Sequence, residues 1–410
     1  MQLELSILTL NVWGIPYVSK DRDIRMQAIG DFFDANSHYD VISLQEVWTE
    51  RDYQSIRKAA ERNLPFSHYF YSGVFGSGLC ILSKYPIVST LFHAWSVNGY
   101  VHRIHHGDWF GGKGVGLCKI LVGEHLVNVY IAHLHAEYDR ESDDYNAHRV
   151  VQAFDTAQFI QSTRCDSCVQ VLAGDLNTEP GDLAYRILMA ASGLRETYNE
   201  TEHGDCCTNE CVDNSYTPTA MKENAPKGKR IDYILYRNGY NHQVKVLEHK
   251  LPLPPKIPGL EISYSDHEAV SAKLLIQTKS KSAETINTCA AKIAEANASA
   301  HTDTLGEGIE VLDQILKRLR SDKNAYFALA LLLIIPLFFL IDVYPPFGMG
   351  MLYLVAKMIF SGIVIFFIFM ATMWNSIERN GILSTKLSME MARTAIAHYD
   401  NQPFLNDHSC

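Results

Sequence analysis

The chain of 410 residues is acidic, with 36 lysines and arginines against 46 aspartates and glutamates and a formal net charge of −10. Hydrophobic residues make up 47% and charged residues 20%, which excludes wholesale disorder and leaves room for one large domain plus a second part. The acidic balance argues against a nucleic-acid-binding protein with a broad basic face, but it does not exclude a nuclease with a local basic cleft.

Residues 1–277 alternate between short apolar runs and helical stretches. The runs are rich in Val, Ile and Leu and are bounded by Gly, Asp or Asn, as strands are. In chain order we expect strands at 6–12, 41–44, 78–82, 115–121, 126–132, 169–173, 230–236 and 269–276. We expect helices at 21–34, 51–62, 143–162 and 183–192. The alternation predicts an α/β domain with helices on the outer faces of its sheet, and it allows two stacked sheets.

Residues 278–324 have a different composition from the domain before them. Their first part is small, polar and rich in Ala, which predicts a linker or a loose helix. Their second part has apolar residues at helical spacing, which predicts a short amphipathic helix next to a membrane. This helix ends in a basic cluster of Lys317, Arg318, Arg320 and Lys323.

Two strongly apolar segments follow, at 325–344 and 351–374. Each is about the length that a helix needs to cross ~30 Å of hydrocarbon, and the turn between them is too short for a domain. We therefore predict a transmembrane hairpin over 325–374 and a tail over 375–410. The basic cluster has no counterpart in the turn, so the positive-inside rule places the N-terminal domain and the tail in the cytosol. The endoplasmic reticulum or another intracellular membrane is the expected location.

The cysteines and the N-terminus fit a cytosolic domain. Of nine cysteines only Cys206, Cys207 and Cys211 lie close together, and their spacing matches neither a zinc site nor a disulfide framework. We expect a reduced protein with scattered core thiols. The N-terminus has no basic region and alternates polar with apolar residues, so it predicts a strand and not a signal peptide. The sequons at Asn199 and Asn297 are then expected to be unused.

Polar side chains follow or begin several of the predicted strands. A lone Asn or Asp after a strand is most often a turn former, but here six segments share the pattern. Carboxylates and amides can hold a hard metal ion and phosphate oxygens, while imidazoles transfer protons near neutral pH. The pattern predicts a metal-dependent phosphoester site. Its residues are Asn11, Gln45, Glu46, His133, His135, Asp175, Asn177, Asp232, Asp266 and His267.

These short motifs resemble those of the endonuclease/exonuclease/phosphatase superfamily, typified by pancreatic deoxyribonuclease. The longer strings resemble the neutral sphingomyelinases, in particular the branch with a C-terminal two-span anchor. The resemblance covers 6–277 and extends to the hairpin, and it implies a four-layered α/β sandwich. The strings that carry it are LNVWGIP, LQEVW, IHHGDWF, GKGVGL and HLHAEYDRESDDYNAHR.

The resemblance also implies roles for the site residues. Glu46 is the principal Mg²⁺ ligand, with Mn²⁺ able to substitute for the metal, and Asn11 and Asp266 complete the shell. His267 is the general base that takes a proton from the attacking water, and Asp232 orients its ring. The two residues expected to position the nucleophile and the phosphate oxygens are Asp175 and Asn177.

Two histidines compete for the position opposite His267. His133 and His135 are two residues apart on one strand, so their side chains share a face and parity does not separate them. The family pattern favours His133 as general acid or as donor to a phosphoryl oxygen, with His135 as its supporting partner. His148 follows the family pattern as a substrate-binding residue, and helix packing explains it equally well.

The glycine-rich segment at 108–114 contains a further pair. In related sphingomyelinases an aspartate and a lysine five positions on form a switch for substrate engagement, and Asp108 and Lys113 have this spacing. The segment is not a nucleotide-binding loop, because Lys113 is followed by Gly114 and not by Ser or Thr.

The function implied is that of a Mg²⁺-dependent neutral sphingomyelinase, which hydrolyses sphingomyelin in the bilayer to ceramide and phosphocholine. Anionic phospholipids are expected as activators through the basic cluster, and nucleic acid is not expected as a partner. The alternatives are an inositol-phosphosphingolipid or phosphoinositide phosphoesterase on the same scaffold, a nuclease, or an inactive membrane scaffold.

Overall fold

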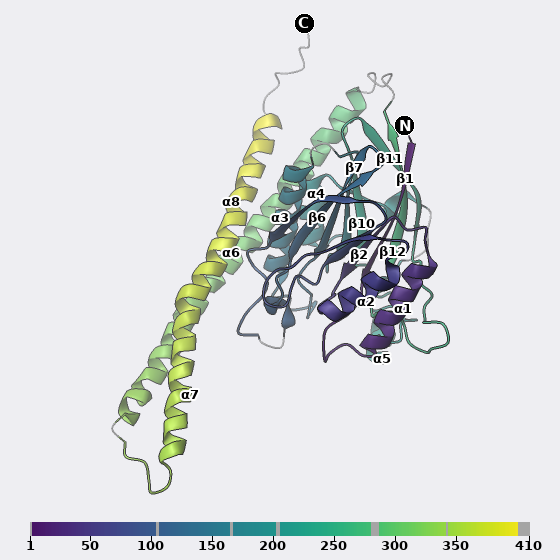
Figure 1. Cartoon of the computed structure of the whole chain (residues 1–410). Coiled ribbons are helices and arrows are strands. Elements are labelled where there is room, and N and C mark those ends of the chain that lie inside the picture. The colour runs from purple at the N-terminus through teal and green to yellow at the C-terminus, as the bar shows by residue number, and fades with distance from the viewer. Residues whose placement is uncertain are drawn as a thin grey trace. The chain divides into compact units, whose positions relative to one another are not determined.

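The computed structural model describes residues 2–103, 106–164, 167–201, 206–279, 287–341 and 343–400. The chain divides into two compact units, of which the first is Met1–Thr304 and the second is Leu305–Asn401. The first unit contains both sheets, and the second is helical (Figure 1).

The first sheet has the strand order β11-β12-β1-β2-β4-β3. β1 pairs in parallel with β2 and antiparallel with β12, so it lies in the middle of the sheet. The strands are β1 (Gln2–Asn11), β2 (Val41–Gln45), β3 (Phe66–Tyr69), β4 (Cys80–Ser83), β11 (His242–Lys250) and β12 (Val270–Thr278).

The second sheet has the strand order β5-β6-β7-β8-β10-β9. β7 and β8 form its parallel pair, and β10 runs antiparallel to β8. The strands are β5 (Ile87–Ala94), β6 (Gly114–Val122), β7 (His125–His133), β8 (Val169–Asp175), β9 (Arg195–Glu196) and β10 (Asp232–Asn238).

One pair of helices covers the outer face of each sheet. On the first sheet these are α1 (Arg22–Ala35) and α2 (Glu50–Ala60), on the second α3 (Asn146–Thr163) and α4 (Leu183–Ser192) (Figure 1). Thr49 caps the N-terminus of α2, because its side chain accepts a hydrogen bond from the Asp52 N–H. The four layers confirm the predicted α/β sandwich. The short helices α5 (Thr219–Asn224), η1 (Gly107–Phe110) and η2 (Tyr198–Glu200) lie in loops.

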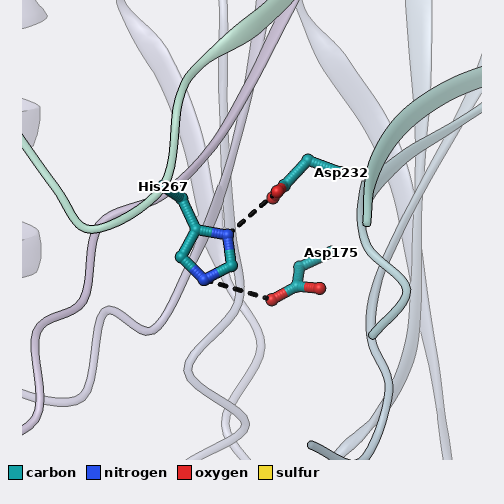
Figure 2. A group of neighbouring side chains, drawn as sticks. All are labelled: Asp175, Asp232 and His267. Carbon is teal, nitrogen blue, oxygen red and sulfur yellow. Dashed lines mark hydrogen bonds and ion pairs between the residues drawn. The ribbon is translucent and has the colours of Figure 1, made fainter. Parts of the chain in front are cut away.

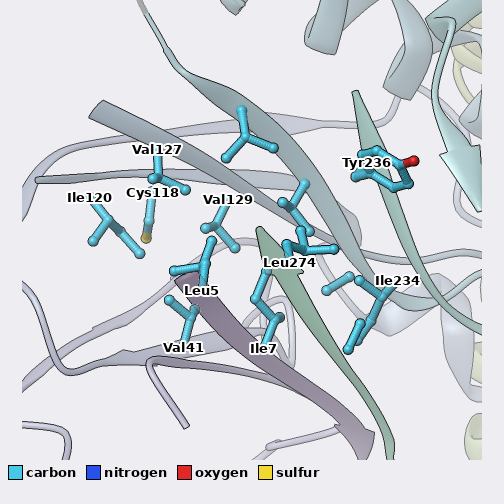
Figure 3. Close-up of a cluster of buried hydrophobic side chains, with 14 of the residues drawn as sticks. Leu5, Ile7, Val41, Cys118, Ile120, Val127, Val129, Ile234, Tyr236 and Leu274 are labelled. Carbon is cyan, nitrogen blue, oxygen red and sulfur yellow. The ribbon is translucent and has the colours of Figure 1, made fainter. Parts of the chain in front are cut away.

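Alternation along the strands divides the apolar residues between two cores. On β1, Leu5 and Ile7 belong to the core between the sheets, whereas Leu8 and Leu10 pack toward α1 and α2. The inter-sheet core draws on both sheets, with Val129 of β7 fully buried in it (Figure 3). The interior strands are thus buried on both faces, which explains their nearly continuous apolar runs.

Long helices make up the second unit, and the first of them begins before Leu305, within the first unit. They are α6 (Asn287–Leu340), α7 (Gly350–Phe369) and α8 (Asn375–Asp400), with the π-helical turn η3 (Met370–Trp374) between the last two. The predicted amphipathic helix is part of α6, which continues through Pro336 without ending. α8 lies beside α6, because Asn375 donates a hydrogen bond to the Leu319 carbonyl at 2.8 Å.

Two stretches of this unit are long and apolar enough to cross a membrane, Ala300–Leu340 and Gly350–Ala397. Only 6% of the most apolar window of the first stretch is buried, so its side chains do not form the core of a soluble domain. Exposed side chains such as Leu332 and Phe338 instead favour membrane association.

The cysteine prediction was wrong for one pair. Cys207 and Cys211 form a disulfide with their Cα atoms 5.8 Å apart, a separation that a bridge requires and that the loop between them provides. Cys80, Cys118 and Cys168 are buried free thiols, as expected.

Candidate active site

The polar residues singled out in the sequence meet at one edge of the sandwich because of the strand directions. The parallel strands β1, β2, β7 and β8 end at this edge, and the antiparallel strands β10 and β12 begin there. Register places Asn11 beside Gln45 in one sheet, and His133 beside Asp175, which in turn pairs with Asp232, in the other.

Alternation also decides which side chains face the space between the sheets. On β7 the inward positions are Val127, Val129 and Ile131, and the next one is His133. On β8 the inward series likewise ends at Asp175. The inward-facing positions of these strands therefore form the apolar inter-sheet core over most of their length and the polar site at their ends.

His267 lies between two aspartates (Figure 2). Its Nδ1 is 2.9 Å from Asp232 Oδ2, and its Nε2 is 3.9 Å from Asp175 Oδ2. Burial alone would lower the pKa of His267, but the Asp232 carboxylate, with Asp175, raises it well above its ordinary value. Asp232 thus fixes the ring through Nδ1 and leaves Nε2 directed toward the cavity.

Glu46, Asn11 and Asp266 form an acidic pocket beside this pair. Glu46 has positive φ directly after β2, and its Oε1 accepts a hydrogen bond from Asn11 Nδ2 at 3.2 Å. Burial, together with the charge of Asp266, raises the pKa of Glu46 to about 7. Burial also raises the pKa of Asp266. Two buried carboxylates that repel each other are a natural cation site.

A buried oxygen without a hydrogen-bond partner tests whether Glu46 and Asp266 fit a metal. Within the described part of the chain, Glu46 Oε2 is buried and has no hydrogen-bond partner. A divalent cation would satisfy that oxygen and relieve the repulsion between Glu46 and Asp266. Ligand atoms of Asp175, Asp232 and His267 also lie within 4.8 Å of one another. Because Nδ1 of His267 is hydrogen-bonded to Asp232, the pocket of Glu46 fits the metal better.

His133 approaches the carboxylates from the other side. Its Nε2 is 3.4 Å from Asp175 Oδ2, 3.9 Å from Glu46 Oε1 and 3.3 Å from Lys113 Nζ. Burial, reinforced by the charge of Lys113, lowers the pKa of His133 to about 3. The ring is therefore neutral near pH 7, a state in which it can donate one hydrogen bond but is a poor acid.

Asp108 and Lys113 form a buried ion pair next to His133. Burial alone would raise the pKa of Asp108, but Lys113 and His135 hold it well below its ordinary value. Asp108 also accepts a hydrogen bond from the Tyr138 hydroxyl at 2.8 Å, and Lys113 donates to the Leu134 carbonyl at 3.1 Å. The lysine is thus held facing the carboxylates and is not a mobile surface charge.

The structure separates His133 from the other two histidines of the prediction. The ring of His135 stacks on Tyr145 with a centroid distance of 3.9 Å, and its Nδ1 lies 2.9 Å from the Ala136 carbonyl. His148 is buried on α3 with its ring 5.6 Å from that of His135. Neither lines the cavity into which His133 faces.

This cavity has a volume of about 670 Å³ and contains most of the predicted site. Asn177, which has positive φ after β8, lines it and is held by a 3.1 Å hydrogen bond from its Nδ2 to the Leu134 carbonyl. The predicted residues that line the cavity are Glu46, Asp108, Lys113, His133, Asp175, Asn177, Asp266 and His267. Aromatic residues form much of the remaining wall, namely Trp13, Tyr17, Trp48, Phe75 and Tyr138.

Two positioning residues were missed in the sequence. Arg25 is fully buried and donates to the carbonyls of Val12 and Trp13 at 2.7 and 2.8 Å, which fixes the loop after β1. Thr208 Oγ1 accepts the backbone N–H of Asp232 at 3.1 Å and so fixes the start of β10. Arg25 looks like an ordinary surface residue of a charged helix, and Thr208 lies in a loop without periodicity.

Comparison with known proteins agrees with this geometry. The model of the Endonuclease/Exonuclease/phosphatase family matches residues 8–267. A Drosophila melanogaster protein assigned to the neutral sphingomyelinases is 45% identical over 95% of this chain and 97% of its own length. Human sphingomyelin phosphodiesterase 2 is 42% identical over 67% of this chain and 65% of its own.

Among solved structures, a Staphylococcus aureus beta toxin with bound magnesium ions has a TM-score of 0.50 and 18% identity. The alignment covers 66% of this chain and 99% of the toxin, and at this identity it shows the fold alone. The family is metal-dependent, and the chain offers the donors that a divalent cation requires. This chain belongs to the neutral sphingomyelinases of the endonuclease/exonuclease/phosphatase family.

Proposed function

We propose that this chain is a Mg²⁺-dependent phosphodiesterase that hydrolyses sphingomyelin to ceramide and phosphocholine. The observation that carries the proposal is the arrangement in one cavity of His267 with Asp232, a neutral His133 and the paired carboxylates Glu46 and Asp266. In-line displacement at phosphorus needs a base, hydrogen-bond donors to the phosphoryl oxygens and a site for positive charge.

His267 acts as the base. The carboxylates that raise the pKa of His267 keep its ring protonated, and the positive charge of a cation held beside Asp266 would offset them and free Nε2. Nε2 then accepts a proton from the attacking water, while Asp232 holds Nδ1–H and stabilises the imidazolium that forms. The water oxygen forms the new bond to phosphorus and the bond from phosphorus to the ceramide oxygen breaks. That oxygen takes up a proton from solvent water, and the imidazolium of His267 returns its proton to solvent. No covalent enzyme intermediate is needed. When bound, Mg²⁺ would be held by Glu46 and Asp266, and it would offset negative charge developing on the phosphoryl oxygens. Asn11 would orient Glu46 and not ligate the metal, because its Nδ2 donates to Glu46 and its Oδ1 accepts the Trp13 N–H.

His133, Lys113 and Asn177 surround the phosphoryl group as donors. Because the pKa of His133 is lowered to about 3, we assign it a hydrogen bond to a phosphoryl oxygen and not the role of general acid. Lys113, held by Asp108, adds a fixed positive charge. Asp175 accepts a hydrogen bond from Asn11 at 3.0 Å and faces both imidazoles, which suits it to position the water.

The cavity wall favours a choline lipid. Trp13, Trp48 and Tyr138 line the cavity, and a quaternary ammonium binds aromatic rings through cation–π attraction, whereas a neutral inositol ring does not. Tyr17 and Phe75 line the same cavity and are well exposed, so apolar surface continues out of it toward solvent. A substrate with acyl chains at the entrance would cover that surface.

The second unit would bring the site to its substrate. We propose that α6 and α7 span the membrane as a hairpin, with the catalytic unit and the C-terminal residues in the cytosol. We place this hairpin in an intracellular membrane, with the endoplasmic reticulum as the first to examine. The basic cluster on α6 is exposed and would attract anionic phospholipids as activators.

The experiment is a headgroup-release assay with the full chain in mixed micelles at neutral pH. Sphingomyelin with Mg²⁺ should yield phosphocholine, chelation should abolish the release, and added Mg²⁺ should restore it, with Mn²⁺ a weaker substitute. Glu46→Gln should lose most of the rate because it removes a metal ligand. Glu61→Gln, at an exposed position directly after α2, should not.

Other lipids in the same assay decide between the alternatives. Release of inositol phosphate from an inositol phosphosphingolipid, or of free phosphate from a phosphoinositide, with sphingomyelin untouched would overturn the choice of substrate. Activity that persists in chelator would overturn the proposed metal.

A further inference from the structure

A second cavity of about 440 Å³ lies in the catalytic unit and shares no lining residue with the catalytic cavity. Its charged lining residues are Arg164, Arg237 and Lys279, and among the described residues no carboxylate lines it. Such a site stands out on a chain whose net charge is −10. Its volume lies in the range of small-ligand sites, which is about 300–1,000 Å³.

One helix and two strands, one from each sheet, bring these cations together. Arg164 directly follows α3, Arg237 is on β10, and Lys279 directly follows β12. The loop between β10 and β11 closes the site, since Lys279 N–H donates to the Asn241 carbonyl at 2.8 Å. The cations are therefore attached to strand and helix ends, which fixes where their side chains begin.

Arg237 is the most firmly held of the three. Its Nη1 donates to Gln161 Oε1 at 3.0 Å and to the Ser192 carbonyl at 2.8 Å, and the residue is half-buried. Both acceptors are uncharged, so they orient the guanidinium without neutralising it. An arginine held in this way has already lost much of the side-chain entropy that binding costs.

Arg164 and Arg237 carry like charges that act on each other. Burial, and after it the charge of Arg164, lowers the pKa of Arg237. Two guanidinium groups that repel each other are unfavourable in a cavity with no carboxylate among its described lining residues, and a bound anion removes that cost. Arginine forks match the tetrahedral oxygens of phosphate, and lysine supplies a further point charge.

We propose that this cavity binds a phosphate group, supplied either by the headgroup of an anionic phospholipid or by free phosphate. The proposal does not depend on catalysis, because it involves none of the catalytic residues.

The test is a ³¹P NMR titration of the full chain in detergent with chelator present, so that the catalytic metal does not bind phosphate. The probes are inorganic phosphate and the short-chain lipid dihexanoyl phosphatidic acid. We expect saturable binding that the double variant R164Q/R237Q weakens at least about tenfold, because two charged hydrogen-bond donors are removed. Lys58→Gln, an exposed cation on α2, is the matched control and should bind as the native chain does.

The two probes separate the two sources. Tighter binding of the lipid than of inorganic phosphate assigns the site to a headgroup, and equal binding assigns it to free phosphate. Native thermal unfolding and sphingomyelin hydrolysis in the double variant would show that it is folded, and Lys279→Gln is a milder second variant. Absence of saturable binding, or equal binding by the native chain and R164Q/R237Q, would overturn the proposal.

Discussion

The catalytic unit and the helical unit use apolar side chains in opposite ways. In the catalytic unit Ile7 and Val129 point inward and are fully buried between the sheets, whereas in the helical unit Leu332 and Phe338 point outward and are 65% and 69% exposed. The first arrangement gains its stability by removing apolar surface from water within the unit, but the second leaves that surface uncovered. The difference teaches that the catalytic unit buries its apolar side chains by its own packing. The part of the helical unit around Leu332 and Phe338 does not, and it requires another apolar environment.

The helical unit itself contains both arrangements. Leu305, Leu312 and Leu319 of α6 are buried at every seventh position, and Ile382 and Met389 of α8 are buried as well. This spacing is that of helices packed along a seam. The unit thus has a self-packed part, and most of its large exposed apolar side chains lie in the region from the end of α6 through α7.

The largest effect should come from breaking the chemistry of the catalytic unit alone. His267→Gln removes the base and should lower the rate of sphingomyelin hydrolysis by about 10²–10⁴-fold. Membrane association of the chain should not change, because the helices that would provide it are untouched. The measurements are phosphocholine release and flotation with vesicles, with His38→Gln, at an exposed position, as the control. Nearly full activity of His267→Gln would contradict the mechanism.

A smaller effect should follow from breaking the packing next to the site. Ile131 precedes His133 by one inward position on β7 and is fully buried. Ile131→Ala should cost about 2–5 kcal/mol through lost burial and a residual cavity. Thermal inactivation should then begin several degrees lower, while the rate per active molecule stays near the native value. A lost rate with an unchanged inactivation temperature would show that Ile131 acts on the chemistry and not on the packing.

The difference between buried and exposed segments also explains how far the sequence predicts this fold. The eight predicted strands are the eight interior strands of the two sheets, and the four that were missed, β3, β5, β9 and β11, are the four edges. Interior strands are buried on both faces and show as apolar runs. Edge strands bury little, as β5 shows with mostly exposed positions, so their sequences resemble loops. The order of strands in the sheets depends on long-range pairing that local patterns do not contain.

The site shows a similar limit. Four site residues are visible in the sequence because each is a polar residue at the first or last position of an apolar strand. They are Asn11, His133, Asp175 and Asp232. Residues that act through the backbone of other segments have no such pattern, and Arg25 is found only when its hydrogen bonds to the loop after β1 are seen. The disulfide between Cys207 and Cys211 was missed for the same reason, because a loop's path decides whether two thiols meet.

The smallest effect should come from the basic cluster, which lies on α6 between its self-packed part and its exposed apolar part. Lys317 is exposed, so its charge is available to a membrane surface. Lys317→Gln removes one charge, worth about 1 kcal/mol near an anionic leaflet, and should raise the phosphatidylserine content needed for half-maximal activity by up to about fivefold. Lys58→Gln on α2 should leave that requirement unchanged. The shift should shrink as salt rises, because screening acts on exposed charges. If Lys317→Gln behaves like the control at every salt concentration, this part of α6 does not meet the lipid surface, and the boundary between the packed and the lipid-facing parts lies farther along the helix.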